Sequence, residues 1–253
     1  MSNISTNLAW QGQMRIHLSE CQSTNDYLHG LAAKGNIEEG TVVTADFQTA
    51  GKGQAGNVWE SARGENLICS LFLRPGFLEA RYAFWLSAAV AIGLAEALEP
   101  YVPDVKVKWP NDLFVNGKKL GGILIENTVV GSKLGQTIVG FGININQVKL
   151  PIAATSLYAE QLHTFSIEEI LAGCISSIYL FYNQLRVFGW EKMRQRYYVR
   201  LYKMGLAQDY RSSDGQIFRA VLKGISADGE LILITSGGEK RYRFKEVSLL
   251  GIG

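Results

Sequence analysis

The fold is decided by residues 105–125, which read VKVKWPNDLFVNGKKLGGILI. Apolar and charged side chains alternate over 105–109, and this period of two indicates a half-exposed strand. Two apolar runs, 113–115 and 120–125, flank an Asn-Gly dipeptide at 116–117. Asn-Gly between such runs is the strongest short-range signal for a β-hairpin. The stretch therefore predicts a sheet that contains antiparallel hairpins.

Strands and helices are predicted on both sides of this hairpin. Strand patterns lie at 16–18, 41–45, 67–73 and 137–145. Helical patterns lie at 23–35, 80–98, 166–185 and 190–203, the first preceded by good N-cap residues and the third by a capping box. Helices and antiparallel hairpins in one chain indicate the α+β class.

The C-terminal tail changes character. Short strand patterns at 218–222, 231–235 and 242–249 are separated by Asp-Gly and Gly-Gly turn signals. Strands this short and closely spaced predict a small β-barrel of about 45–50 residues. We therefore predict two domains, a mixed sheet with helices over 1–204 and a barrel over 205–253.

Composition argues against several classes of protein. The 253 residues carry 25 Lys and Arg against 23 Asp and Glu. Their net charge of +2 argues against a protein that grips nucleic acid over a broad surface. The three cysteines form no Cys-x-x-Cys pair, which indicates neither a zinc ribbon nor a disulfide framework. Hydrophobic residues at 47% and charged residues at 19% are typical of a soluble globular chain.

No targeting or membrane segment is predicted. Residues 1–10 have neither the basic region nor the apolar region of a signal peptide. The most apolar stretch, 82–98, contains Ser87, Gly93 and Glu96, which fits a buried helix better than a membrane span. We therefore expect a cytoplasmic protein with no membrane partner.

The first candidate for chemistry is the glycine-rich loop 51–56, GKGQAG. It matches the letters of the G-x-G-x-x-G dinucleotide motif, but that motif needs a helix to begin inside it, and 57–64 has no helical period. A Walker loop is excluded because glycine, rather than Ser or Thr, follows Lys52. Two interpretations stay open, a loop that binds an anion through Lys52 and backbone N–H groups, and an ordinary surface loop.

A second candidate site is rich in lysine. It comprises Lys106, Lys108, Asn111, Asp112, Lys118 and Lys119. A solvated sheet edge explains such lysines. However, glycines at 121–122 and at 140 and 142 interrupt good strands, which favours close approach of a ligand or another backbone. The three histidines form no catalytic arrangement, so charge neutralisation, as in nucleotidyl transfer, fits best.

Five motifs in this order resemble biotin protein ligases. They are STN (23–25), QTAGKGQAGNVW (48–59), KWPND (108–112), KLGGIL (119–124) and GFGIN (140–144). The resemblance implies a catalytic domain related to class II aminoacyl-tRNA synthetases, followed by an SH3-like barrel. It also implies two steps. Biotin and ATP, with Mg²⁺, give biotinyl-5′-AMP, and a lysine of a biotin carboxyl carrier protein then takes the biotinyl group.

The resemblance further implies residue roles. Three residues would be catalytic. Lys119 would act on the biotin carboxylate, Asp112 on the incoming lysine and Lys52 on the acyl-phosphate. Biotin would bind to Ser23, Thr24, Asn25, Gln48, Gly51, Lys52, Gly53, Gln54, Trp59, Lys119, Gly122, Leu124 and Gly142. ATP would bind to Lys52, Trp59, Asn111, Asp112, Lys119 and Asn144, with Asn144 also the candidate ligand of Mg²⁺.

Some of these roles are specific, and two compete with other interpretations. Ser23, Thr24 and Gln48 would bind the ureido head of biotin, and the glycines at 122 and 142 would let its rings lie against backbone. Asn25 is equally a helix-cap residue in sequence. Trp59 is either a wall of the site or a plain core residue.

Two departures from the family pattern stand out. Lys52, Gln54 and Ala55 occupy places where many relatives have arginine, and lysine lacks the planar fork that grips phosphate. We therefore expect the adenylate to be held less tightly.

The second departure is at the N-terminus. Only about 15 residues precede the first motif, too few for a helix-turn-helix domain, so we expect no DNA binding. The resemblance also implies that a homodimer paired through sheet edges is open to this chain, although nothing in the sequence demands one.

Two other functions stay open. A lipoate ligase on the same catalytic fold shares the lysine-before-small-residue pattern, although the ureido-binding residues and the barrel favour biotin. The other alternative is a non-catalytic binding module that uses the barrel and the basic helix at 190–203 to contact a partner.

Overall fold

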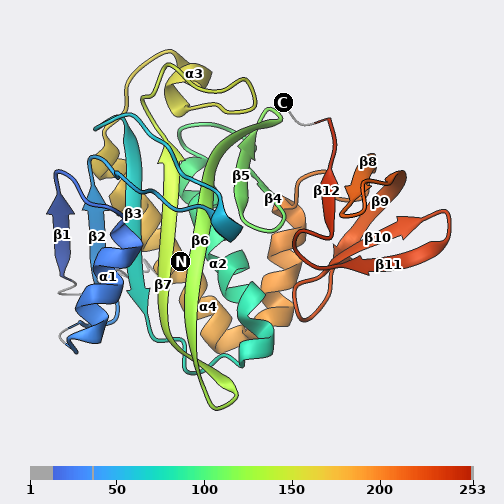
Figure 1. Ribbon diagram of the computed structural model, residues 1–253, viewed down its shortest axis with the longest axis horizontal. Coiled ribbons are helices and arrows are strands. Elements are labelled where there is room, and N and C mark those ends of the chain that lie inside the picture. The colour runs from blue at the N-terminus through green and yellow to red at the C-terminus, as the bar shows by residue number, and fades with distance from the viewer. Residues whose placement is uncertain (1–13, 36, 252–253) are drawn as a thin grey trace, which may run out of the picture.

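The computed structural model describes residues 14–35 and 37–251, so the segment 1–10 lies outside the described residues. Its centre is a seven-stranded sheet of order β1-β2-β3-β7-β6-β5-β4 (Figure 1). The strands are β1 (Arg15–Leu18), β2 (Val42–Ala45), β3 (Asn66–Leu73), β4 (Lys106–Lys108), β5 (Asp112–Val115), β6 (Lys118–Val130) and β7 (Lys133–Asn144). β1 and β2 are parallel and the remaining neighbours are antiparallel, which makes the sheet mixed.

The hairpin predicted around 116–117 joins β5 to β6. Asn116 has φ 49° and Gly117 has φ 80°, the two positive values that a two-residue hairpin turn requires. β6 then continues far beyond the predicted strand and pairs with β7 along most of its length. Within this pairing Gly121 lies so close to the carbonyl of Gly142 that a side chain there would collide with it. The two long strands form the floor of the site described below.

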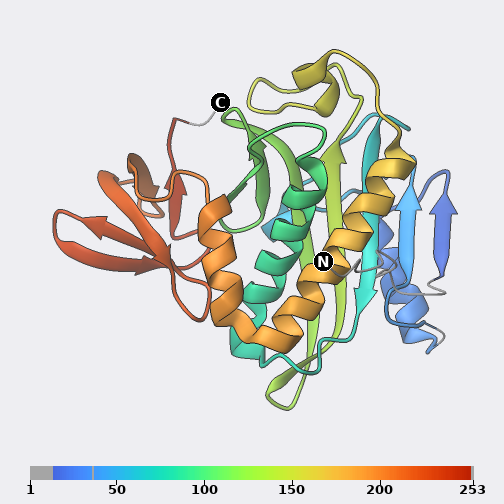
Figure 2. The same ribbon diagram turned by 180° about the vertical axis from the view of Figure 1, so that it is seen from behind.

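Helices cover both faces of the sheet. The helical elements are α1 (Thr24–Ala33), α2 (Ala83–Leu98), α3 (Leu157–Gln161), α4 (Ile167–Arg200) and the 3₁₀ turns η1 (Gln54–Gly56) and η2 (Ala80–Tyr82). α1 lies on one face, and α2 and α4 lie on the other (Figures 1 and 2). The segment Ala80–Leu98 is long and apolar enough to cross a membrane, yet 61% of its most apolar window is buried in the fold. The prediction of a buried helix there is confirmed.

The prediction of two helices at 166–185 and 190–203 is confirmed. α4 consists of two helices that meet at Gly189, where φ is 75°, ψ is 178° and the backbone leaves helical geometry. After the kink, Arg200 forms ion pairs with Glu96 and Glu99, so this end of the basic helix is tied to α2 and its neighbouring turn.

A second sheet follows α4, with the order β11-β10-β9-β8-β12. Its strands are β8 (Ala207–Ser212), β9 (Ile217–Ile225), β10 (Leu231–Thr235), β11 (Gly238–Tyr242) and β12 (Val247–Leu249), all antiparallel. One buried apolar cluster extends from α2 and α4 into this sheet through Leu222 and Leu233. In addition, Trp85 Nε1 donates to the carbonyl of Ala227 at 2.7 Å. The predicted α+β class, a mixed sheet with helices followed by a small β unit, is confirmed.

Candidate active site

A cavity of about 560 Å³ lies where the main sheet, the glycine-rich loop and the C-terminal sheet meet. Of the residues predicted for the site, these line it: Ser23, Thr24, Asn25, Gln48, Lys52, Gly53, Gln54, Trp59, Asn111, Asp112, Lys119, Gly122, Leu124 and Gly142. Gly51 and Asn144 do not. The fold therefore gathers residues that are more than one hundred positions apart in the chain around one cavity.

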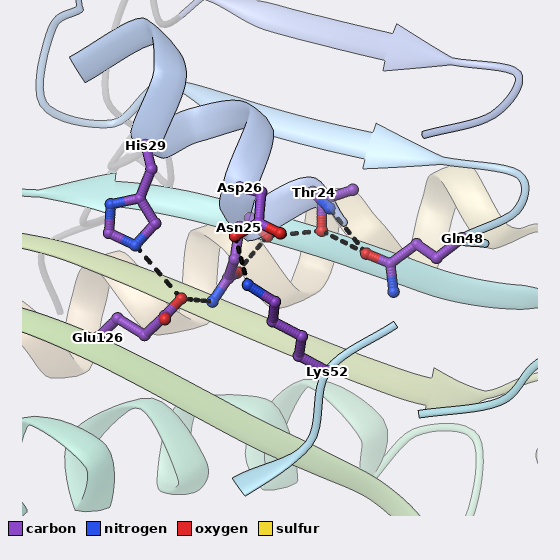
Figure 3. Close-up of polar contacts among 8 residues, drawn as sticks. Thr24, Asn25, Asp26, His29, Gln48, Lys52 and Glu126 are labelled. Carbon is purple, nitrogen blue, oxygen red and sulfur yellow. Dashed lines mark hydrogen bonds and ion pairs between the residues drawn. The ribbon is translucent and has the colours of Figure 1, made fainter. Parts of the chain in front are cut away.

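One end of the cavity carries neutral hydrogen-bonding groups. The backbone N–H of Thr24 donates to Gln48 Oε1 at 2.7 Å, and Thr24 Oγ1 lies 3.1 Å from the same oxygen (Figure 3). The backbone hydrogen bond holds the Gln48 amide at the start of α1. Ser23 is the N-cap residue of α1, but its side chain makes no capping hydrogen bond. Three polar side chains are thus presented at the beginning of one helix.

Asn25 corrects one interpretation, because it is not a helix cap. It is the second residue of α1 and is buried. Its Nδ2 donates to Glu126 Oε2 at 2.6 Å, and its Oδ1 accepts from Ser70 Oγ at 2.6 Å. Gly140 lacks a side chain where one would collide with the Asn25 amide. The Asn25 side chain therefore links α1 to two strands of the sheet, β3 and β6, by hydrogen bonds.

The other end of the cavity is cationic. Lys119 Nζ lies 2.7 Å from Asp112 Oδ1, and Asp112 is the only carboxylate among the described residues that line the cavity. Lys108 also lines it, a member of the predicted lysine-rich site to which the resemblance gave no role. Burial lowers the pKa of Lys108, and the positive charge of Lys119 lowers it further, while Asp112 opposes both effects.

Trp59 is a wall of the cavity and packs against Gly142. A Cβ on Gly142 would collide with the indole ring of Trp59. Gly142 still lines the cavity, so its contact with the rings of a ligand stays a prediction. The indole Nε1 of Trp59 is buried and has no partner among the described residues. At Gly122, in contrast, an added Cβ would not collide but would lie in contact with the Asp112 and Lys119 side chains, 3.4 Å from each.

The glycine-rich loop is ordered by its own backbone. The N–H of Trp59 donates to the carbonyl of Gly51, and the N–H of Gly53 donates to the carbonyl of Asn57. Gly51 is buried, and a side chain there would collide with the carbonyl of Trp59. Gly51 is thus packed inside the loop and does not line the cavity. The loop's cation, Lys52, reaches over the cavity to Asp26 on α1 (Figure 3).

Asn144 corrects another prediction. It is buried at the end of β7, and its Nδ2 donates to the carbonyl of Thr155 at 3.0 Å. In this position the side chain holds the segment around Thr155 through that hydrogen bond. It does not line the cavity, so contact with ATP or Mg²⁺ is not supported. The sequence misled here because Asn144 ends a motif whose earlier glycines do reach the site.

The C-terminal sheet supplies part of the cavity that the sequence did not predict. These lining residues include Tyr210, Arg211, Ser212, Leu222, Leu231, Phe244, Lys245 and Val247. No local pattern marks them, because their spacing is that of ordinary short strands. They reach the site only because the second sheet packs beside β4 and β5.

Comparison with known proteins now decides the family. The model of the biotin/lipoate A/B protein ligase family matches residues 18–144, which include the α1 end of the cavity, the glycine-rich loop and Lys119. This chain belongs to that family. The matched segment also contains every residue that was predicted to be catalytic.

Individual relatives agree with this membership of the ligase family. The bifunctional ligase/repressor BirA of Bacillus subtilis is 32% identical over 250 residues, which cover 94% of this chain and 74% of the relative. A biotin–[acetyl-CoA-carboxylase] ligase of Paracoccus denitrificans is 28% identical, covering 91% of this chain and 98% of the relative. A biotin protein ligase of Aquifex aeolicus, solved with biotin and ATP, superposes with a TM-score of 0.77 at 28% identity, covering 93% and 98% of the two chains.

Proposed function

We propose that this protein is an ATP-dependent biotin protein ligase. It activates biotin to biotinyl-5′-AMP and transfers the biotinyl group to a lysine of a biotin carboxyl carrier protein. The observation that carries this function is the polarity of the cavity. Thr24 and Gln48 present neutral hydrogen-bonding groups at the start of α1, and Lys108 on β4 and Lys119 on β6 present ammonium groups. Biotin has the same layout, a cyclic urea at one end and a carboxylate at the other.

In the first step two anions must meet. The carboxylate oxygen of biotin attacks the α-phosphorus of ATP, and pyrophosphate leaves. Fixed cations offset the repulsion between the two anions and the charge that develops in the transition state. We assign this work to Lys119, which faces Asp112 across 2.7 Å, with Lys52 covering the acyl-phosphate from the loop. The apolar wall formed by Trp59 limits water around these charges.

In the second step a lysine of the carrier attacks the acyl carbon, an amide bond forms and AMP leaves. The attacking amine must first lose a proton, because an ammonium group is not a nucleophile. We assign Asp112 as the acceptor of that proton, since it is the only carboxylate among the described lining residues. An ionised carboxylate has only acceptor oxygens, which suits it to take the proton.

A resident Mg²⁺ site does not fit the residues present. No group of three or more His, Cys, Asp and Glu side chains that could hold a metal occurs among residues 14–35 and 37–251. Asp112 is already paired with Lys119, and Asn144 does not line the cavity. We therefore propose that any Mg²⁺ enters on the phosphates of ATP, as part of the substrate.

The test is exchange of labelled pyrophosphate into ATP by the purified chain. Exchange that depends on biotin supports the proposal, and transfer of labelled biotin to a carrier domain tests the second step. Exchange with lipoate instead of biotin would establish the second candidate function, which the family model keeps open because it covers both kinds of ligase. Absence of exchange with either acid would indicate a binding module.

Other parts of the proposal concern organisation and partners. We place the boundary between the catalytic unit and the small C-terminal unit at residues 204–205. Because the C-terminal sheet lines the cavity, we expect the separated N-terminal unit to lose activity. Formation of a homodimer and lack of affinity for DNA stay predictions, which sedimentation and a DNA mobility-shift assay test.

A further inference from the structure

A chain of polar side chains leads from Glu126 on β6 to Thr24 at the cavity (Figure 3). Asn25 stands at its centre, with Nδ2 2.6 Å from Glu126 Oε2 and Oδ1 2.6 Å from Ser70 Oγ. Ser70 Oγ is also 2.6 Å from Thr24 Oγ1. Asn25, Ser70 and Thr24 are all buried. Water therefore does not replace these contacts, and each one must be a proper hydrogen bond.

The carboxylate of Glu126 fixes the orientation of the Asn25 amide. An ionised carboxylate only accepts hydrogen bonds. Its Oε2 faces two donors, the amide of Asn25 and the ring Nε2 of His29 at 3.4 Å. The Asn25 amide must therefore turn its NH₂ group to Glu126 and its carbonyl oxygen to Ser70. The opposite orientation would bring two oxygen acceptors together.

The fixed amide sets the direction of the remaining bonds. The Asn25 oxygen cannot donate, so the single hydroxyl proton of Ser70 must point to it. The short contact between Ser70 and Thr24 is then a hydrogen bond only if Thr24 donates. Thr24 consequently has its proton on the buried side of the hydroxyl and only lone pairs on the cavity side. The longer contact of 3.1 Å between Thr24 Oγ1 and Gln48 Oε1 is then not a hydrogen bond, and Gln48 Oε1 accepts from the backbone N–H of Thr24 instead.

We propose that Glu126 is a positioning residue of the ligase, which acts through Asn25 and Ser70 to hold Thr24 as an acceptor for a urea N–H of the substrate. The inference rests on the proposed function, because a cyclic urea supplies this donor. Without the carboxylate the bonds can run in reverse, from Asn25 to Ser70 to Thr24. The Thr24 proton would then lie on the cavity side and oppose an incoming N–H group.

Two substitutions at Glu126 separate this role from simple packing. Glu126→Leu removes the acceptor, whereas Glu126→Gln can keep a carbonyl oxygen toward Asn25. We expect Glu126→Leu to raise the Kd for biotin about tenfold, the scale of one hydrogen bond, and to raise the KM for biotin but not for ATP. Glu126→Gln should bind biotin as the unsubstituted chain does. Glu168→Leu removes an exposed carboxylate that pairs with Arg15 and is the matched control.

The decisive ligand is a biotin analogue in which a ring oxygen replaces one urea N–H. The unsubstituted chain should prefer biotin strongly, since two facing acceptors repel. In Glu126→Leu the reversed Thr24 hydroxyl can donate to the ring oxygen, so the preference should shrink. Ser70→Ala cuts the chain at its middle and should shrink the preference in the same way, which keeps the test available if Glu126→Leu fails to fold.

Two failures have different meanings. If the unsubstituted chain shows no biotin-dependent exchange, the proposed function falls, and this inference falls with it. If that chain is active but Glu126→Leu and Ser70→Ala keep its full preference for biotin over the analogue, only the role of Glu126 is overturned. Loss of preference in both variants, with Glu126→Gln unaffected, supports the role.

Discussion

Lys52 Nζ lies 2.5 Å from Asp26 Oδ1, so the cation of the glycine-rich loop is ion-paired with the first turn of α1 (Figure 3). The hydrogen bond to Asp26 raises the pKa of Lys52 and keeps the lysine charged. Both side chains are substantially exposed, so the pair adds little to folding stability. Its consequence is functional, because Asp26 competes with any anion that Lys52 is to bind.

Replacing Asp26 by asparagine should therefore strengthen retention of the adenylate. The carboxylate charge is lost while the size of the side chain is kept, and Lys52 becomes free for the phosphate. We expect the off-rate of biotinyl-5′-AMP, measured by stopped flow, to fall several-fold. Asp104→Asn, which removes the carboxylate paired with Lys106, is the matched control. An off-rate in Asp26→Asn that is unchanged or faster would contradict this competition.

Lys119→Ala should abolish the first step without unfolding the protein. We expect pyrophosphate exchange to fall at least about a hundredfold, the scale of removing one charge-stabilising donor in an active site. Because the pair with Asp112 is partly exposed, the melting temperature should change little. The neighbouring Lys118 is exposed and does not line the cavity, so Lys118→Ala should exchange normally. Full exchange by Lys119→Ala would show that another group binds the carboxylate.

Gly142→Ala should displace Trp59. The added methyl group collides with the indole ring, and such overpacking costs about 1–3 kcal/mol. We expect weaker biotin binding and altered tryptophan fluorescence, because the wall of the cavity moves. Gly173→Ala places a methyl group in open space on α4 and serves as the control. If Gly142→Ala binds biotin normally with unaltered fluorescence, Trp59 does not depend on this glycine.

Lys108 should lose its proton at a lower pH than an ordinary lysine. Burial disfavours its charged form, so its pKa is lowered, and the nucleophilic neutral amine forms earlier as the pH rises. In competitive acetylation followed by mass spectrometry, labelling of Lys108 should therefore begin at lower pH than labelling of a free lysine derivative added as the standard. Bound ATP should slow the labelling of Lys108. A profile for Lys108 identical to that of the free standard would refute this prediction.

Tyr197→Phe should stabilise the protein. The Tyr197 side chain is fully buried, burial raises the pKa of its hydroxyl, and that oxygen has no partner among the described residues. Removing an unpaired buried hydroxyl should increase the free energy of unfolding by about 1 kcal/mol. Tyr182→Phe should do the opposite, because the Tyr182 hydroxyl donates to Glu39 at 2.6 Å. Thermal or urea unfolding of both variants measures the signs, and a loss of stability in Tyr197→Phe would count against the prediction.

Much of the fold and of the site was accessible to sequence reasoning. The Asn-Gly turn at 116–117 and the buried helix near 82–98 follow from local spacing, and the place of Lys119 in the site follows from the resemblance of its motif to biotin protein ligases. Local spacing failed where a side chain's role depends on a distant partner. Asn25 looks like a helix cap in sequence, but Glu126, 101 residues away, makes it a link inside the sheet. The packing of Trp59 against Gly142 is likewise a contact between distant residues that no local pattern indicates.

The sequence by itself determined the elements, the turns and the chemical groups available, because periodicity, capping and turn geometry act over a few neighbouring residues. Only the tertiary structure decided which groups meet. The C-terminal strands line the cavity, Asn144 is turned away from it, and Asp26 pairs with Lys52. These outcomes depend on strand register and on packing between elements far apart in the chain, and a local pattern contains neither.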